Sequence, residues 1–125
     1  MTHNQISETV VDCAIKLHTD LGPGLYELVY EAALFHLLLK RGLHCKRQVP
    51  ITFTYDGVTF DEGFRADIIV NDLVLLEIKS VESLHAAHRK QIQTYLKLST
   101  LKLGLILNFG QAFLKDGIVR AVNNL

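Results

Sequence analysis

The amino-acid sequence predicts one α/β domain in which two N-terminal helices precede a mixed central sheet. Its 125 residues are 49% hydrophobic and 21% charged, with two prolines, a composition typical of a globular domain and unlike disordered or collagen-like chains. Apolar residues first recur at helical spacing, then alternate as in strands from residue 44 to residue 79, and return to helical spacing after residue 80. No linker, repeat or low-complexity tract divides the chain, so we expect residues 1–125 to form a single domain.

The first two elements are predicted to form a helical hairpin. Apolar positions from Ile6 to Leu21 follow the helical period, and the sequence Gly22-Pro23-Gly24 ends that pattern. A second helical pattern runs from Leu28 to Leu39, and Gly42 is placed to cap it.

Three strands are predicted next. The first has alternating apolar residues up to the turn at Asp56-Gly57, the second runs from about Val58 to Val70, and the third covers Leu73 to Lys79. Residues 84–98 then predict a third helix and residues 104–109 a buried strand. The tail, residues 112–122, is expected to add a hairpin around Asp116-Gly117.

Charge is unevenly distributed, although the formal net charge is zero. Residues 1–82 contain 12 acids and 7 bases, whereas residues 83–125 contain one acid and 6 bases. This distribution favours an acidic part that holds cations and a basic part that contacts phosphates, or two solvated faces of opposite sign.

Cellular location is inferred from three features. The two cysteines have no CxxC spacing, the N-terminus has no leader pattern, and the longest apolar stretch, Ala32 to Leu39, is interrupted by His36. We therefore expect a soluble, cytoplasmic protein that makes no membrane contact.

Ionisable residues lie inside two strands that are otherwise apolar. An unpaired carboxylate is costly to bury, so Asp67 and Glu77 are expected to be paired or to bind a cation. Their oxygens, with the main-chain carbonyl of Ile78 and water, suit Mg²⁺ or Mn²⁺, and Lys79 beside them could assist a nucleophilic water. The alternative is a structural salt bridge of Glu77 with Lys79, or of Asp67 with Arg65.

A shared metal requires Asp67 and Glu77 to face the same side of the sheet. A two-residue turn at Asn71 and Asp72 would place Glu77 opposite Ala66, on the wrong face. We therefore predict an odd-length turn centred on Asp72, or a bulge that restores the register.

Three motifs follow one another along the chain. Residues 24–30 have the form Gly-x-x-Glu-x-x-Tyr, Asp67 is followed by Glu77-Ile78-Lys79, and residues 91–95 have the form Gln-x-x-x-Tyr. In this order they resemble the PD-(D/E)XK nuclease superfamily, and the GxxExxY family within it, over nearly the whole chain. The resemblance implies a restriction-endonuclease-like core in the order helix, three strands, helix, strand. One departure is Ala66, where the superfamily has proline.

The resemblance also implies site residues. Glu27, Asp67 and Glu77 would be metal ligands, Lys79 the catalytic lysine, and Gln91 with Tyr95 a pair that orients substrate or water. Glu27 could instead be a first-turn acid that suits the helix dipole, and Gln91 with Tyr95 a polar pair beside a packed face.

Further residues are expected to contact the substrate. Lys90 and Lys97 are seven apart on one helix face, a spacing that suits phosphate contacts or a solvated surface, and Tyr30 and Arg65 complete the predicted set. His85 and His88 lack further ligands for zinc.

Together these observations predict a metal-dependent nuclease that acts on DNA or RNA, with a possible homodimer for duplex cleavage. The alternative is a non-catalytic binding or adaptor protein that keeps the nuclease fold. The presence of all four polar residues (Glu27, Asp67, Glu77, Lys79) favours the enzyme, whereas the neutral charge and the lack of a DNA-reading module favour the adaptor.

Overall fold

The computed structural model describes the backbone of residues 1–125 and the side chains of all of them except Glu62. The elements in chain order are α1 (His3–Leu21), α2 (Glu27–Lys40), β1 (Cys45–Tyr55), β2 (Val58–Val70), β3 (Val74–Lys79), α3 (Ala86–Ser99), β4 (Leu103–Asn108), the 3₁₀ helix η1 (Leu114–Gly117) and β5 (Ile118–Val122). The strands form one sheet in the order β1-β2-β3-β4-β5, in which β3 and β4 pair in parallel and the other neighbours antiparallel. The predicted α/β class, with two N-terminal helices and a mixed sheet, is confirmed.

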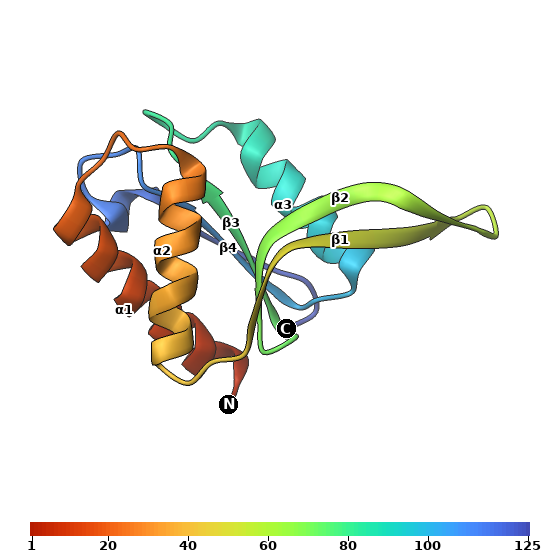
Figure 1. Ribbon diagram of the computed structural model, residues 1–125. Helices are drawn as coiled ribbons and strands as arrows, with labels where there is room; N and C mark the ends of the chain where they lie inside the picture. The colour runs from red at the N-terminus through yellow and green to blue at the C-terminus, as the bar shows by residue number, and fades with distance from the viewer.

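Helices cover both faces of this sheet, α1 and α2 on one side and α3 on the other (Figure 1). The larger core, under α1 and α2, includes Leu76 and Ile78 of β3, whereas Leu75 packs under α3 with Ile92. Successive strand side chains point to opposite faces. Glu77 and Lys79 therefore lie on the α3 side of the sheet.

The helix ends follow local rules. Thr2 caps α1 in a capping box, in which its side chain accepts from the Gln5 N–H and the Gln5 side chain accepts from the Thr2 N–H. Gly22 and Gly42 follow the two helices with φ of 76° and 82°, a conformation that glycine adopts without strain. The turn and cap predicted from the sequence thus lie where expected.

The β2–β3 hairpin has the register that a shared site requires. Asn71 and Asp72 both have positive φ, and the Leu73 N–H donates to the Val70 carbonyl at 3.0 Å, which closes a two-residue turn. Pairing nevertheless starts with Val70 opposite Val74 and continues to Ile68 opposite Leu76. One residue, Leu73, is therefore extra, and the restored register that the sequence predicts is confirmed.

Beyond this hairpin, β2 leaves β3 and continues with β1 as a two-stranded ribbon that projects from the body (Figure 1). Its register shifts between Ile51 and Phe53. Gly63 fits the close approach of the strands there, since a Cβ at this residue would lie 2.3 Å from the Ile51 carbonyl oxygen. The ribbon ends in the Asp56-Gly57 turn.

The C-terminal tail differs from its prediction. Residues 114–117 form the 3₁₀ helix rather than the first arm of a hairpin, and β5 pairs with β4 instead. Gly117 explains the difference, because its backbone packs so closely on Asn108 that a Cβ would lie 2.6 Å from that carbonyl oxygen. Among the described residues, no helix is long and apolar enough to cross a bilayer.

Candidate functional site

Asp67 and Glu77 form a carboxyl pair at the point where β2 and β3 separate. Continued register would place Ala66 opposite Ile78, but the ladder ends at Ile68. There the Ile78 N–H donates instead to Oδ2 of Asp67, at 2.7 Å. The Asp67 carboxylate thus occupies the gap between the strands, close enough to the buried carboxyl of Glu77 for each group to shift the pKa of the other.

This pair is held in a low-dielectric environment. Burial first, and then the neighbouring Asp67 carboxylate, raises the pKa of Glu77 to about 9, while Lys79 opposes the shift. Burial also raises the pKa of Asp67, against the lowering effect of the Ile78 N–H. The pair therefore retains a proton at neutral pH.

One atom of the pair fits a divalent cation. Oε1 of Glu77 is buried and has no hydrogen-bond partner among the described residues, and an unsatisfied buried polar atom is destabilising. Two carboxyls and the nearby main chain of Ile78 are the oxygen donors that Mg²⁺ prefers. The described side chains contain no cluster of three His, Cys, Asp or Glu able to hold a metal.

The salt bridges proposed as alternatives do not form. Neither a Glu77–Lys79 nor an Asp67–Arg65 pair is within ion-pair distance among the described side chains, where the four ion pairs involve other residues. The carboxyls therefore keep their oxygens free of cationic partners in this structure.

Helix α3 contributes Tyr95 and Gln91 to the same region. The Tyr95 ring stacks on Phe64 of β2 with centroids 3.7 Å apart. Burial raises the pKa of Tyr95, the carboxylates of Glu77 and Asp67 raise it further, and a hydrogen bond with the Gln91 side chain lowers it. Tyr95 thus lies beside the carboxyl pair, and Gln91 lies next to Tyr95.

Sequence reasoning missed Glu31, a further buried carboxylate that is linked to Asp67 through the Gln48 side chain. Glu31 of α2 is 2% exposed and accepts from Arg47 at 2.8 and 2.9 Å and from the Gln48 amide at 2.6 Å. The same amide lies 3.5 Å from Oδ1 of Asp67. Gln48 has a φ of 50°, unusual for a residue other than glycine. The signal available in the sequence was an acidic residue, Glu31, within the largely apolar pattern of residues 28–39.

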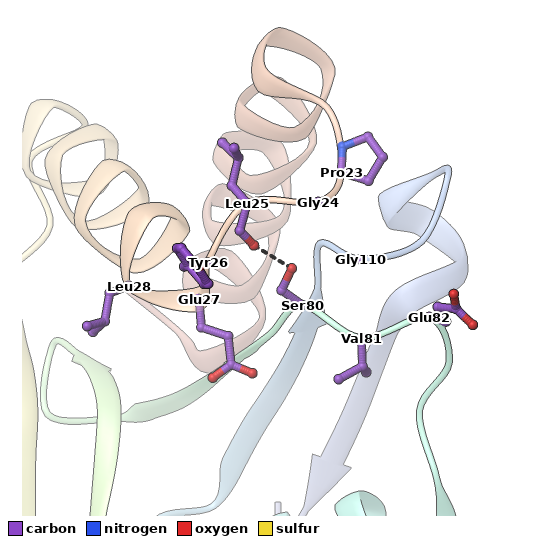
Figure 2. Close-up of a pocket in the computed structure, with 10 residues that line it drawn as sticks. All are labelled: Pro23, Gly24, Leu25, Tyr26, Glu27, Leu28, Ser80, Val81, Glu82 and Gly110. Carbon is purple, nitrogen blue, oxygen red and sulfur yellow. Dashed lines mark hydrogen bonds between the residues drawn. The ribbon is translucent and has the colours of Figure 1, made fainter.

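Glu27 lies elsewhere, in an open pocket of about 850 Å³ between the α1–α2 turn and the segment after β3 (Figure 2). The other lining residues are Pro23, Gly24, Leu25, Tyr26, Leu28, Ser80, Val81, Glu82 and Gly110. The Glu27 side chain is exposed. It belongs to no three-residue metal cluster of the described side chains, so the structure does not bring it together with Asp67 and Glu77 as ligands.

Tyr30 was predicted to contact substrate, and this prediction is wrong. Its side chain is fully buried and stacks on Phe109 at a centroid distance of 4.4 Å. Its hydroxyl donates to the Gly22 carbonyl and accepts from the Leu25 N–H. The tyrosine therefore holds the α1–α2 turn closed.

The predicted cationic contacts are all exposed. Arg65 lies on the ribbon and donates to the Gln48 carbonyl at 3.3 Å, while Lys90 and Lys97 lie on α3. His85 and His88 serve a structural purpose, because His85 precedes α3 and its N–H donates to Nδ1 of His88.

Comparison with known proteins agrees with this geometry. A family model described as the PD-(D/E)XK nuclease superfamily matches residues 4–121. No curated protein and no solved structure matches the sequence significantly. The match covers the helical hairpin, the carboxyl pair, Lys79 and α3, and the chain belongs to the PD-(D/E)XK nuclease superfamily.

Proposed function

We propose that this protein is a metal-dependent nuclease that hydrolyses phosphodiester bonds at Asp67, Glu77 and Lys79. The observation that carries the proposal is the buried, unpartnered Oε1 of Glu77 beside the Asp67 carboxyl. The atom lies where β2 and β3 separate, in a chain that belongs to the nuclease superfamily. A divalent cation would supply the missing partner.

Asp67 and Glu77 would hold Mg²⁺ or Mn²⁺, with the Ile78 carbonyl as a further oxygen donor. The bound ion would neutralise phosphate charge and lower the pKa of water. Before binding, Glu77 has to release the proton that its raised pKa retains. Glu27 remains a candidate for a contact through water from the neighbouring pocket.

Lys79 would act on the reacting water and phosphate. It follows Glu77 by two residues and so lies on the same face of β3, close enough to lower the pKa of both carboxyls. Its ammonium group can orient the water or stabilise charge that develops on the phosphate. Tyr95 and Gln91 line the α3 side of this space and would orient the water or the substrate.

Nucleic acid would approach along the exposed cations. Arg65 on the ribbon and Lys90 and Lys97 on α3 lie on elements that flank the carboxyl pair, and each can contact a phosphate. One domain carries one such site, so cleavage of both strands of a duplex would require a homodimer. The two buried cysteines are free, in keeping with a reducing compartment such as the cytoplasm.

The test compares wild type with Lys79→Ala and with Lys16→Ala, an exposed α1 lysine, as the matched control. Labelled single-stranded and duplex DNA and RNA are incubated with Mg²⁺ or Mn²⁺ and resolved on a gel. We expect wild type and Lys16→Ala to cleave, and Lys79→Ala to lose cleavage while retaining metal affinity. A wild type that cleaves no more than Lys79→Ala would overturn the nuclease in favour of a binding or adaptor protein.

A further inference from the structure

The pocket between the α1–α2 turn and the segment after β3 opens beside Ser80, which directly follows Lys79. We propose that this pocket holds an unpaired nucleobase of the substrate, stacked on Tyr26. The proposal rests on the proposed nuclease function, because Ser80 of the pocket directly follows Lys79, the residue that would contact the scissile phosphate.

Tyr26 is an unusual residue for the start of a helix. It occupies the N-cap of α2, where Ser, Thr, Asp or Asn is preferred, and its side chain makes no capping hydrogen bond. The side chain is also 87% exposed, so its ring adds little to the core. Stability does not explain a tyrosine at this position. An exposed aromatic ring beside a pocket is a stacking surface for bases.

The charge of the pocket selects a base over a phosphate. Glu27 and Glu82 line it, and none of its described lining residues is Lys, Arg or His. Two carboxylates repel phosphate, but they accept hydrogen bonds from the amino and ring N–H groups of bases. Apart from Tyr26 and Ser80, whose hydroxyl is bonded to the Leu25 carbonyl, the remaining lining residues are apolar or glycine, with Leu25, Leu28 and Val81 among them. Such walls suit an uncharged planar ring.

The walls of the pocket are held in place before any ligand arrives. The Ser80 hydroxyl donates to the Leu25 carbonyl at 2.7 Å and joins the two sides (Figure 2). Asn108 holds the other wall, because its amide exchanges two hydrogen bonds of 3.0 Å with the main chain of Val81. A preformed pocket loses little entropy when it binds.

The shape and charge of the pocket restrict the class of substrate. A base in a duplex is paired and stacked, so it can enter the pocket only from a single strand or after extrusion. We infer a preference for nucleic acid with an unpaired nucleotide beside the scissile phosphate.

The test measures binding of oligonucleotides that carry 2-aminopurine, whose fluorescence is quenched on stacking, with Ca²⁺ in place of Mg²⁺. Wild type is compared with Tyr26→Ser, Tyr26→Phe and the exposed-tyrosine control Tyr55→Ser. We expect Tyr26→Ser to lose the quenching and to bind single strands about tenfold or more weakly. Tyr26→Phe and Tyr55→Ser should match wild type. The Tm of Tyr26→Ser should equal or exceed that of wild type, because serine caps the helix.

Equal quenching and affinity in wild type and Tyr26→Ser would overturn the inference, as would a wild type that shows no quenching. A cleavage assay separates the two proposals. If cleavage depends on Lys79 but not on Tyr26, the nuclease proposal is supported and the base-pocket proposal is wrong. If wild type cleaves nothing, the nuclease proposal is wrong, and the base-pocket proposal is then tested by the Tyr26-dependent quenching alone.

Discussion

The main-chain N–H of Ile78 donates a hydrogen bond of 2.7 Å to Oδ2 of Asp67. A side-chain carboxylate thereby takes a donor that a continued β2–β3 ladder would have paired with main chain. The bond has two consequences: it fixes the orientation of Asp67 toward Glu77, and it lets β2 depart from the sheet into the ribbon. A residue proposed for chemistry is therefore also part of the backbone hydrogen bonding of the fold.

Substitutions at Asp67 should separate these two contributions. Asp67→Ala leaves the Ile78 N–H without its acceptor and should lower the free energy of unfolding by about 1–3 kcal/mol. Asp67→Asn keeps a side-chain oxygen at the same place, so its stability should stay near that of wild type while its affinity for Mn²⁺ falls. Urea unfolding and calorimetric titration give the two quantities, and equal stability of both variants would contradict the structural contribution.

The metal-free protein should lose stability as the pH rises. The pKa of Glu77 is about 9 in the folded protein against an ordinary value of 4.5, so between these pH values the folded state binds more protons than the unfolded state. The free energy of unfolding should then fall with pH across this window, by up to about 1.4 kcal/mol per unit. Urea unfolding in EDTA from pH 5 to pH 9 measures the slope. Glu77→Gln, which has no such proton, should flatten it, and identical slopes would exclude Glu77 as the cause.

Gln48 should matter more for the metal than for the fold. Its left-handed backbone is strained for glutamine but not for glycine, whereas its amide contacts Asp67 and Glu31. Gln48→Gly relieves the strained backbone, which should offset the loss of the amide hydrogen bond to buried Glu31, so stability should change little. Mn²⁺ binding should weaken about tenfold, as the loss of an outer partner does in other metal sites. Gln48→Asn, which tolerates the same backbone, serves as the comparison. Unchanged Mn²⁺ affinity in Gln48→Gly would show that Asp67 does not depend on the amide.

Removal of the Tyr30 hydroxyl should destabilise the α1–α2 turn. Tyr30→Phe loses the hydrogen bonds to Gly22 and Leu25 but keeps the stacking on Phe109, so the free energy of unfolding should fall by about 1–2 kcal/mol. Tyr55→Phe, at an exposed position of the ribbon, should have no effect. Thermal unfolding of the two variants side by side gives the answer, and equal Tm values would refute the structural assignment of Tyr30.

The exposed lysines of α3 should contribute through phosphate contacts. A double Lys90→Ala, Lys97→Ala variant should bind nucleic acid more weakly and reduce the slope of log K against log salt concentration by roughly two. A double Lys16→Ala, Lys40→Ala variant, altered on the opposite helical layer, provides the matched control. Equal slopes in the two double variants would remove α3 from the proposed interface.

Much of the fold could be predicted because local signals agree with it. The period of apolar residues located the helices and strands, and β2 begins and ends at the predicted residues Val58 and Val70. The requirement that Asp67 and Glu77 share a face predicted the extra residue in the turn. The 3₁₀ helix at residues 114–117 could not be predicted, because it goes with the close packing of Gly117 on Asn108, a tertiary contact that the local pattern of residues does not show.

The candidate site was predicted less completely. The alternation of the strands was enough to identify Asp67, Glu77 and Lys79 as candidates on neighbouring strands. The motif on α2 gave no indication that Tyr30 is fully buried or that Glu31, one turn beyond Glu27, is linked to Asp67 through the Gln48 amide. Such contacts depend on how a helix rotates over the sheet, and a single sequence does not specify that rotation.

Calorimetric titration of wild type with Mn²⁺ at several pH values between 6 and 8 examines the metal site itself. Because Glu77 must release its proton to bind, we expect one Mn²⁺ per chain, release of about one proton at pH 7, and affinity that rises about tenfold per pH unit. Titration in two buffers of different ionisation enthalpy gives the proton count, and Glu77→Gln should lose most of the binding. Binding that is absent, or that is independent of both pH and Glu77, would contradict a divalent metal site at Asp67 and Glu77.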